Sequence, residues 1–301
     1  MKVTLFKAFP DSYRQSMLVY IDRLKEALHP MLEPTEEIRV FSPRKAFLTP
    51  RFLRHYSQYI GYQFEAIFKQ GDVNHVIDHS YGHLLHTIDC KRTVITFHDA
   101  IGIKIRHGGF RIDENNRKLD LLRRYNLSGI CKAATVICVS ESSRRDFLSY
   151  GGCASEKVEV IYEGVDESFF KVPTEDPKKR FGLKPGNYLL HVGHTQFYKN
   201  IPALFHVLAI LNHTLGKNVK LIKVGTAFTP DQERLIGDLG LHDRIIHLGM
   251  IEGTLLPDVY RAASVLLFPS HYEGFGFPVL EAMASSLPER QVTYFQKARG
   301  K

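Results

Sequence analysis

The sequence predicts an α/β fold with parallel sheets, divided between two domains. Short apolar runs typical of buried strands alternate with stretches of helical period along the whole chain, which is the pattern of repeated strand-helix units. A length of 301 residues favours two domains, each large enough to bury its own core. A charged stretch with two prolines, 171–180, is typical of a linker. We therefore expect domains at 1–172 and 173–301.

Six strands are predicted in the first domain, because six short runs are rich in β-branched and apolar residues. They cover residues 3–6, 38–41, 73–78, 93–97, 135–139 and 158–162. Helical periodicity runs through residues 17–28, 52–68, 119–131 and 142–150. Ser140 suits the N-cap of the last of these helices, because its side-chain oxygen can accept a hydrogen bond from a first-turn amide.

The second domain continues the alternation with four predicted strands. They cover residues 188–192, 219–224, 245–248 and 265–268. The helices between them are expected at residues 201–215, 230–239 and 254–263. Pro278 suits the first position of a further helix, because its missing N–H would be unbonded there and its φ is already helical.

Composition excludes several classes of protein. The hydrophobic and charged fractions, 44% and 24%, are those of a globular protein, and no run of 18 apolar residues predicts a membrane span. The net charge of +8 comes from 40 basic and 32 acidic residues spread over both halves, without basic residues interleaved with aromatics in one run. We therefore expect no nucleic-acid partner.

Two further features concern surroundings and redox state. The basic, leucine-bearing segment 106–132 suits either a helix that touches anionic lipid or, more commonly, a solvated helix packed through its leucines. Cys90, Cys131, Cys138 and Cys153 show no C-x-x-C spacing and fall mostly in apolar runs. This favours buried thiols in a reducing cytosol over disulfides or zinc.

Polar and glycine residues follow the carboxyl ends of the predicted strands. They include His98 and Asp99, Ser140 and Glu141, Gly193 and His194, Gly225, His271 and Glu273. Open parallel sheets bind ligands outside those strand ends. Two such sheets would face a shared cleft, with a donor on one domain and an acceptor on the other.

Segment 271–284, His-Tyr-Glu-Gly-Phe-Gly-Phe-Pro-Val-Leu-Glu-Ala-Met-Ala, carries the strongest signal. It places Glu273 and Glu281 eight residues apart, across a glycine-bracketed turn and the start of a helix. The free amides of that helix should point back at residues 274–276, where the positive end of the helix dipole favours a phosphate. Two glutamates beside a phosphate pocket suit the hydroxyls of a ribose and of a sugar.

These motifs together resemble a retaining glycosyltransferase of family 4. The strong matches are residues 193–200 (Gly-His-Thr-Gln-Phe-Tyr-Lys-Asn), 247–251 (His-Leu-Gly-Met-Ile), the Glu273-x7-Glu281 signature and 282–285 (Ala-Met-Ala-Ser). Weaker matches lie at 96–99, 139–145 and 162–166, where Glu163 stands at a position that is often asparagine. The resemblance implies the GT-B fold, which is two Rossmann-like domains facing a central cleft.

The resemblance also implies roles for single residues. Lys199 matches one member of a basic pair that neutralises the diphosphate without a metal or any other cofactor, and His194 stands where the other member is usually arginine. A neutral histidine donates one hydrogen bond rather than a bidentate fork. Glu273 and His98 would act at the transferred sugar. The other donor-binding positions are Met250, Ile251, Gly274, Phe275, Gly276, Phe277, Val279 and, at the ribose, Glu281.

The implied reaction is transfer of a mannose- or glucose-type hexose from a GDP- or UDP-linked donor to a glycan or lipid-linked acceptor, with retention of configuration. It implies a cytoplasmic enzyme of polysaccharide biosynthesis, with peripheral membrane contact as a further expectation. Members of the family usually continue after the Leu287-Pro288 position with a strand, and the tail 289–301 does not match. We therefore expect an incomplete second domain of four strands, with an uncovered sheet edge.

Two alternatives remain open. The first is a non-catalytic nucleotide-sugar-binding or interaction protein derived from such an enzyme by truncation. The second is a GT-B sugar-nucleotide epimerase, which the Glu-x7-Glu spacing disfavours.

Overall fold

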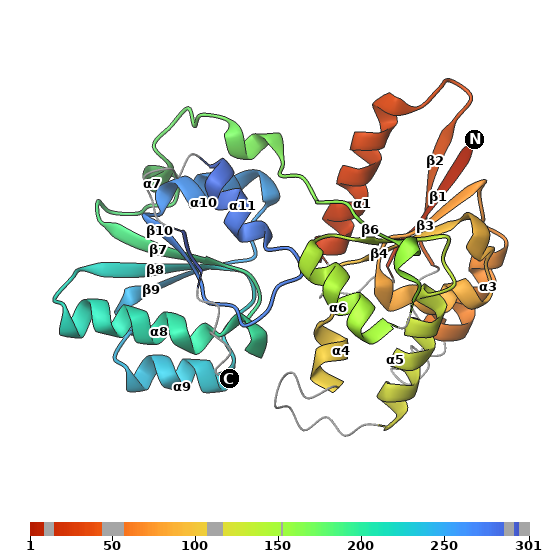
Figure 1. Cartoon of the computed structure of the whole chain (residues 1–301). Helices are drawn as coiled ribbons and strands as arrows, with labels where there is room; N and C mark the ends of the chain where they lie inside the picture. The colour runs from red at the N-terminus through yellow and green to blue at the C-terminus, as the bar shows by residue number, and fades with distance from the viewer. Residues whose placement is uncertain (9–14, 44–56, 107–116, 152, 286–291, 295–301) are drawn as a thin grey trace. The chain divides into compact units, whose positions relative to one another are not determined.

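The computed structural model describes residues 1–8, 15–43, 57–106, 117–151, 153–285 and 292–294. The chain forms two compact units, residues 1–163 and 164–301, each an α/β unit with one parallel sheet (Figure 1). The division lies ahead of the expected boundary at 172 and 173. Phe169 packs in the core of the second unit, and Arg261 donates hydrogen bonds to the carbonyls of Ser168 (3.2 Å) and Phe169 (2.9 Å).

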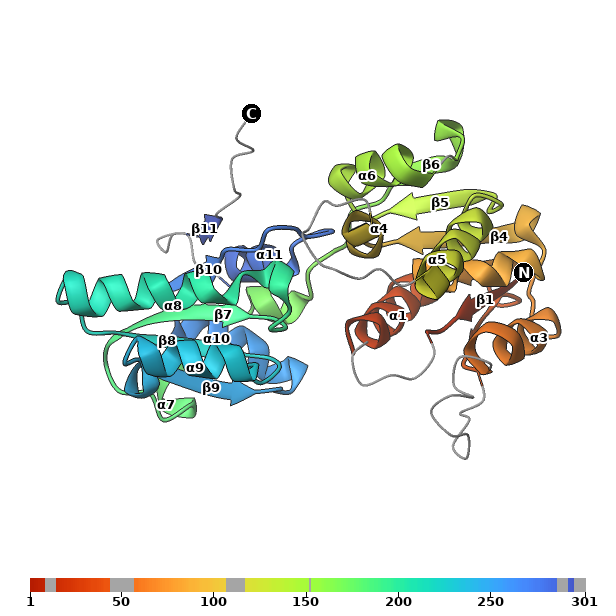
Figure 2. The same cartoon turned by 90° about the horizontal axis from the view of Figure 1, so that it is seen from below.

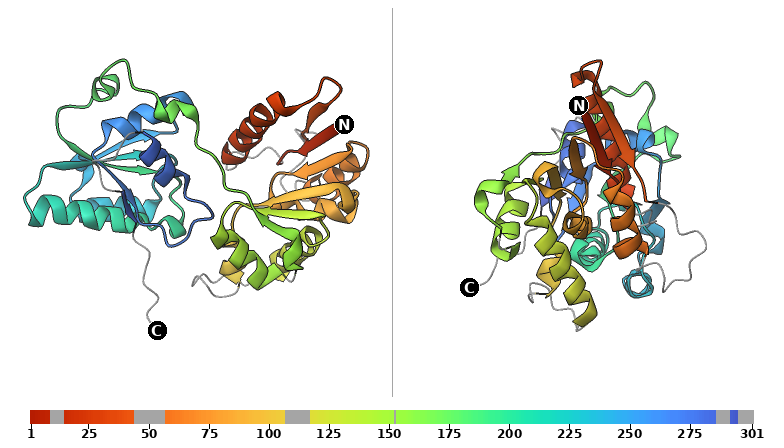
Figure 3. Two further views of the ribbon diagram at one scale, coloured as in Figure 1. Left: turned by 45° about the horizontal axis from the view of Figure 1, so that its top comes forward. Right: turned by 90° about the vertical axis from the view of Figure 1, so that its right-hand side faces the viewer.

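The sheet of the first unit has six described strands in the order β2-β1-β3-β4-β5-β6, all parallel. The left view of Figure 3 shows this sheet with its helices. The strands are β1 (Lys2–Phe6), β2 (Glu37–Phe41), β3 (Val73–Val76), β4 (Thr93–Phe97), β5 (Thr135–Cys138) and β6 (Val158–Val160). All six predicted strands are confirmed, and β3 and β6 end two residues earlier than predicted.

The helices of the first unit follow the predicted order, with additions. They are α1 (Gln15–Leu28), η1 (His29–Met31), η2 (Ser57–Gly61), α3 (Tyr62–Ile67), η3 (His79–His86), η4 (Cys90–Arg92), α4 (Ile101–Arg106), α5 (Arg117–Ile130), α6 (Glu141–Gly151) and η5 (Ser155–Lys157). The Ser140 N-cap is confirmed, because the amide of Ser143 donates to its side-chain oxygen at 3.0 Å. Residues 52–56 of the expected helix 52–68 lie outside the described residues.

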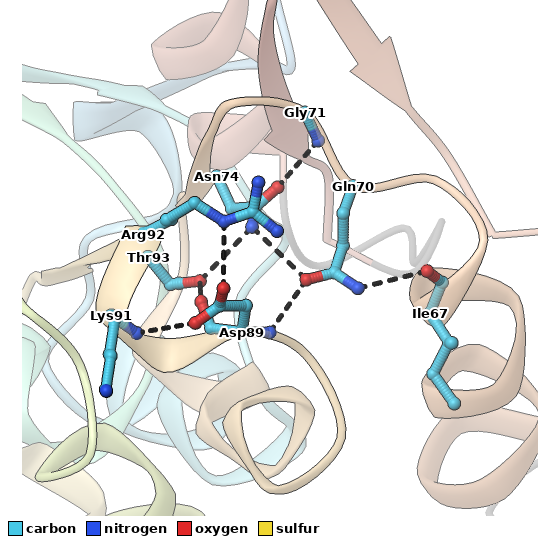
Figure 4. Close-up of polar contacts among 8 residues, drawn as sticks. All are labelled: Ile67, Gln70, Gly71, Asn74, Asp89, Lys91, Arg92 and Thr93. Carbon is cyan, nitrogen blue, oxygen red and sulfur yellow. Dashed lines mark hydrogen bonds and ion pairs between the residues drawn. The ribbon is translucent and has the colours of Figure 1, made fainter.

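A polar network closes the amino end of this sheet (Figure 4). Asn74, fully buried on β3, accepts from the amide of Gly71 (3.0 Å) and donates to the side chains of Gln70 (3.5 Å) and Thr93 (3.4 Å). Asp89 accepts from the guanidinium of Arg92 at 2.8 Å. These groups satisfy one another, so the network has a structural role, and a binding site is better sought at the carboxyl ends of the strands.

The expectation of free thiols is wrong for two of the four cysteines. A disulfide joins Cys131 to Cys153, with Cα atoms 5.1 Å apart, while Cys90 and Cys138 are free. Cys131 follows α5 and Cys153 follows α6, so the intervening β5-α6 unit brings together cysteines 22 residues apart. A local C-x-x-C spacing was therefore the wrong criterion.

The second unit has a parallel sheet of five described strands in the order β11-β10-β7-β8-β9. The strands are β7 (Asn187–Val192), β8 (Val219–Val224), β9 (Ile245–Gly249), β10 (Val265–Phe268) and β11 (Val292–Tyr294). The expectation of four strands is wrong, because β11 pairs in parallel with β10 through Leu266 and Val292 (Figure 2). Its Val-Thr-Tyr sequence has the β-branched and aromatic residues that strands favour.

Helices cover both faces of the second sheet, as Figures 1 and 3 show. They are η6 (Glu167–Phe170), α7 (Pro177–Arg180), η7 (Phe197–Lys199), α8 (Ile201–Ala209), η8 (Ile210–Thr214), α9 (Pro230–Asp238), η9 (His242–Arg244), η10 (Gly253–Leu255), α10 (Leu256–Ala262) and α11 (Phe277–Ala284). Neighbours on β7 face opposite ways: Leu189 packs toward α8 and α9, whereas Leu190 packs toward α10 and α11. In the parts of the chain that the structure describes, no helix is long and apolar enough to cross a membrane.

Candidate functional site

The loops after β7 and β10 meet at the carboxyl edge of the second sheet. These strands are neighbours at the point where the strand order reverses, which is where open α/β sheets bind ligands. The amide of His271 donates to the carbonyl of Tyr198 at 2.7 Å, and the side-chain amide of Asn200 donates to the carbonyl of Pro269 at 3.2 Å. The two loops are thus joined by hydrogen bonds from both sides.

Lys199 and Glu273 form an ion pair across this junction. The ammonium nitrogen of Lys199 lies 2.7 Å and 2.9 Å from the two carboxylate oxygens of Glu273. The side chains are only 10% and 16% exposed, so the pair is screened little by water. The structure therefore brings the residue proposed to bind phosphate into direct contact with the residue proposed to bind the sugar.

A pocket of about 160 Å³ opens beside Gly193, a residue that the side chain of Lys199 approaches closely. Its lining consists of Val192, Gly193, His194, Val224, Gly225, Met250, Ile251 and Leu256. Three of the predicted donor-binding residues thus meet in one pocket from two loops, His194 from the loop after β7 and Met250 and Ile251 from the loop after β9. Gly193 and Gly225 have φ values of 144° and 115°, which favour glycine.

His194 is a neutral member of the pocket. Burial lowers its pKa, and the positive charges of Lys199 and Lys223 lower it further. Since an ordinary histidine has a pKa near 6.5, the imidazole of His194 is mostly uncharged at neutral pH. It can donate one hydrogen bond to a ligand.

The helix of the Glu-x7-Glu segment is α11, and its start differs in one position from the expectation. Gly276 is the N-cap, with φ 97°, and Phe277 is the first helical residue. Pro278 therefore occupies the second position rather than the first, where its missing N–H is equally unneeded. The ring of Phe277 packs edge to face with that of Phe275 at 5.1 Å, which shapes the turn ahead of the free amides.

Glu281 is one turn into α11, as predicted, and is buried. The hydroxyl of Tyr260 donates to its carboxylate at 2.8 Å. Burial raises the pKa of Tyr260 well above its ordinary value, and the charge of Glu281 raises it further. Val279, another predicted donor-binding residue, packs against the adjoining core cluster.

His98 belongs to the first unit, where it follows β4. Its Nδ1 lies 3.2 Å from the carboxylate of Glu163 and its Nε2 lies 2.8 Å from the carbonyl of Ile77. Burial alone would lower the pKa of His98, but the hydrogen bond and the charge of Glu163 outweigh burial and raise it. Both ring nitrogens face acceptors, an arrangement that favours the imidazolium form.

Three residues near these groups were not predicted: Glu163, Lys223 and Tyr260. Glu163 stood out only as a departure from asparagine in the 162–166 motif. Lys223 had a readable signal, because it interrupts an apolar strand on the same face as Leu221. Nothing in the local sequence marked Tyr260, which reaches Glu281 only through the packing of α10 on α11.

The described residues contain no group of three or more His, Cys, Asp or Glu side chains arranged to hold a metal ion. That the reaction needs no metal or other cofactor stays a prediction.

Two family models match the chain, one in each half. Residues 19–169 match the model described as Glycosyltransferase Family 4, and residues 173–289 match the model described as Glycosyl transferases group 1. The first of these covers half of the chain.

Relatives of known name match part of the chain. An uncharacterized glycosyltransferase of Methanocaldococcus jannaschii is 30% identical over 164 residues, which is 52% of this chain and 42% of that protein. The serotype-specific mannosyltransferase WbdA of Escherichia coli is 28% identical over 204 residues, which is 64% of this chain and 24% of that protein. The chain thus spans less than half the length of these relatives.

Solved structures show the same fold. Sucrose-phosphate synthase from Thermosynechococcus elongatus superposes with a TM-score of 0.74 at 18% identity, covering 97% of this chain and 80% of that one. Anabaena HepE in complex with UDP and glucose gives a TM-score of 0.65 at 20% identity, covering 96% and 79%. With its two Rossmann-like domains in the GT-B arrangement of strands and helices, the chain belongs to glycosyltransferase family 4.

Proposed function

We propose that the chain transfers a mannose- or glucose-type hexose from a GDP- or UDP-linked donor to a glycan or lipid-linked acceptor, with retention of configuration. The observation that carries this proposal is the Lys199–Glu273 pair, 2.7 Å apart, beside the pocket that holds His194. It combines a cation for a diphosphate with a carboxylate for sugar hydroxyls at the switch point of the sheet.

The roles of the groups follow from their charge. Departure of a nucleoside diphosphate leaves negative charge on the diphosphate, which Lys199 and the free amides of α11 stabilise. Glu273 accepts hydrogen bonds from the sugar and favours the positive charge that develops at its anomeric carbon. Glu281, fixed by Tyr260, suits the ribose hydroxyls.

His98 is proposed to act on the sugar from the first unit. Because both of its N–H groups are directed at Glu163 and at the carbonyl of Ile77, the imidazolium contributes a positive charge to the sugar site rather than a base. We assign no side chain as the base. Retention fits attack by the acceptor oxygen on the donor face from which the diphosphate leaves, with the departing phosphate oxygen taking the proton of the acceptor hydroxyl.

Names of relatives support a hexose. Besides WbdA, the O-antigen chain mannosyltransferase RfbU of Salmonella typhimurium is 29% identical over 153 residues, 51% of this chain. HepE is described in complex with UDP-glucose. These names support the sugar class and a role in polysaccharide biosynthesis for this chain.

The test compares donor turnover by the wild-type protein with turnover by a variant that lacks the carboxylate of Glu273. Wild-type protein is incubated with GDP-mannose, UDP-glucose or UDP-N-acetylglucosamine, and released nucleoside diphosphate is measured. We expect turnover of one donor, and Glu273→Gln should lower it by at least about 100-fold, which corresponds to roughly 2.7 kcal/mol of transition-state stabilisation. Glu233→Gln, at an exposed position on α9, is the matched control and should keep full activity.

Donor binding without turnover would instead support the non-catalytic alternative. The anomeric configuration of the product, read by NMR coupling constants, decides whether it is retained.

Contact with a membrane surface belongs to the same proposal. In the first unit, Phe64 on α3 and its C-cap Phe68 are 65% and 71% exposed, and Leu121 on α5 is 70% exposed. The two helices are linked by a hydrogen bond from Gln63 to the hydroxyl of Tyr125, 3.3 Å long. Apolar side chains exposed on α3 and on the adjoining basic helix α5 suit an anionic lipid surface. Residues 107–116 of the basic segment lie outside the described residues.

Vesicle sedimentation tests this contact. Binding to vesicles with about one-third anionic lipid should fall at least roughly threefold when Phe64 and Phe68 are both changed to serine, because aromatic area leaves the interface. Phe170→Ser, an equally exposed aromatic of the second unit, should leave vesicle binding unchanged. Equal loss in both variants would argue against a specific surface.

A further inference from the structure

Lys223 is a fully buried lysine directly behind the pocket. It lies on β8, one residue before the pocket-lining Val224. Its side-chain nitrogen lies within hydrogen-bonding distance of three backbone carbonyls, of Gly193 (2.6 Å), Val224 (2.8 Å) and Thr226 (3.4 Å). The neutral amine has two N–H donors and leaves one of these carbonyls without a donor, whereas the ammonium has three and satisfies them all. These contacts tie the loop after β7 to the loop after β8.

Lys223 is the centre of a basic row that crosses the sheet. In the strand register it stands beside His191 on β7 and His247 on β9. The Nε2 of His247 lies 3.0 Å from the carbonyl of Gly225, and the Nδ1 of His191 lies 3.2 Å from the carbonyl of Leu267. All three side chains therefore hold backbone carbonyls of the strand ends and loops that frame the site.

His191 is neutral in this row. Burial and the positive charge of Lys223 lower its pKa to about 3. With the Nδ1 proton donated to Leu267, the buried Nε2 is an acceptor without a hydrogen-bond partner. The row thus contains a buried acceptor nitrogen to which no described group donates, in addition to the buried amine of Lys223.

The charges around Lys223 do not balance. Within the described ranges, no carboxylate forms an ion pair with Lys223, and Glu273 already pairs with Lys199. Burial, followed by the charge of Lys199, lowers the pKa of Lys223 to about 7. A buried ammonium without a counter-ion is unfavourable, so an anion arriving in the adjacent pocket would stabilise its charged form.

We propose that Lys223 is the buried counter-charge of the diphosphate site and positions its two glycine loops, so that binding of a diphosphate drives uptake of one proton from the buffer onto the Lys223 amine. This inference rests on the proposed donor site. The inference goes beyond that site, because it assigns the pH dependence of ligand affinity to a residue behind the pocket.

The groups that face Lys223 decide how the coupling is measured. They are Lys199, His191, His194, His247 and, through Lys199, Glu273. Lys199 stays paired, and the buried Nε2 of His191 is too weakly basic to take up a proton at neutral pH. His194 is the competing proton acceptor. Burial and both lysines lower its pKa, so it is neutral in the free protein and could gain a proton when an anion binds. At about pH 8 the free form of His194 is mostly neutral, and the His194→Asn variant measures any proton that it takes up on binding. A pKa near 7 leaves about nine-tenths of the free Lys223 amine deprotonated at that pH.

Titration calorimetry with inorganic pyrophosphate, UDP and GDP at about pH 8, in buffers of different ionisation enthalpy, measures this uptake. Wild-type protein should take up close to one proton per bound diphosphate. Lys223→Met should take up none and should bind at least roughly tenfold more weakly at about pH 6.5, where the wild-type amine is charged. Lys223→Arg should recover most of the affinity without proton uptake, because a guanidinium is always charged.

Two variants serve as controls. Lys220→Met removes the same charge from a partly exposed position on the opposite face of β8. It should change the diphosphate affinity by no more than about twofold and should leave the proton uptake unchanged. His194→Asn should bind more weakly but keep the uptake at about pH 8. If Lys223→Met does not fold, Lys223→Arg and the wild-type uptake decide the question.

The inference and the proposed function fail separately. Donor turnover with no proton uptake at about pH 8, and with Lys223→Met affinity within about twofold of wild type, overturns the inference and leaves the function standing. Lys223-dependent uptake with pyrophosphate in a chain that turns over no donor supports the inference and overturns the function. Absence of diphosphate binding at about 10 mM overturns both.

Discussion

At the scale of single residues, the charged state of His98 is set by one neighbour, Glu163. The pair is almost fully enclosed, with side chains 11% and 9% exposed, and Tyr20 packs its ring against His98 at 5.0 Å. Asparagine at position 163 would offer a neutral acceptor. The carboxylate instead raises the pKa of His98 and favours its protonated form, which changes the chemistry that His98 can offer.

This pair makes stability depend on pH. The pKa of His98 in the folded chain lies above its ordinary value of 6.5, so its contribution is fully present below about pH 6.5. It is lost as pH rises through the folded pKa. Glu163→Gln should therefore destabilise the first unit by about 1–2 kcal/mol near pH 6 and by less near pH 8.

Denaturant unfolding at both pH values, together with NMR titration of the His98 ring, measures the effect. Glu159→Gln, an exposed position on β6, is the control. Identical pH profiles for the two variants would contradict the role given to Glu163.

A second prediction concerns the hydroxyl of Tyr260. Its hydrogen bond to the buried carboxylate of Glu281 is charge-assisted, so Tyr260→Phe should lower the free energy of unfolding of the second unit by about 1.5–3 kcal/mol. Tyr188→Phe removes a hydrogen bond to the neutral carbonyl of Lys184 and should cost about 1 kcal/mol. Urea unfolding compares the two. A smaller loss for Tyr260→Phe would show that Glu281 is held by other contacts.

At the scale of elements, the pocket depends on how closely the loops after β7 and β8 approach. The amide of Gly225 donates to the carbonyl of Gly249, and a side chain on Gly225 would collide with the carbonyl of Gly193. Because Lys223 ties the same two loops, no small shift of either loop relieves this collision. Glycine at 225 is therefore required by contact as well as by its φ of 115°.

Gly225→Ala should cost at least about 2 kcal/mol more than Gly240→Ala and should abolish diphosphate binding. Gly240 also has positive φ, at 61°, but open space around it, so Gly240→Ala isolates the backbone strain, about 1–2 kcal/mol. Thermal unfolding gives the stabilities and calorimetry gives the affinity. Equal losses in the two variants would show that the loops can separate.

The sequence predicted some helices and strands of the second unit more accurately than others. Strands β7, β8 and β10 are apolar runs bounded by polar residues, and they were predicted within a residue or two. The β11 strand was missed, because three residues in a charged tail gain strand structure only by pairing with β10. The predicted helix 201–215 was also found in altered form, since its second part, 210–214, is wound as a π-helix.

At the scale of the whole molecule, the chain consists of two separate cores. Each unit has its own sheet, and the pocket is lined only by residues of the second unit. Ligand binding should therefore stabilise the second unit first. The gain is about 2.7 kcal/mol at a ligand concentration 100 times the dissociation constant.

Hydrogen exchange tests this division. With UDP or GDP bound, amides of the loops after β7, β8, β9 and β10 should exchange at least roughly tenfold more slowly. The amide of Asn74, in the internally satisfied network of Figure 4, should not change. Protection confined to the first unit would contradict the placement of the pocket.

The sequence by itself determined the alternation of strands and helices and the types of residue at the carboxyl ends of the strands. Both follow from hydrophobic periodicity and local turn chemistry, which are written in neighbouring residues. Tertiary structure alone decided which of these residues touch. Lys199 reaches Glu273 because β7 lies beside β10, and Tyr260 reaches Glu281 because α10 packs on α11. Lys223 gains its environment from two flanking strands, and the burial that gives it a lowered pKa exists only in the folded sheet.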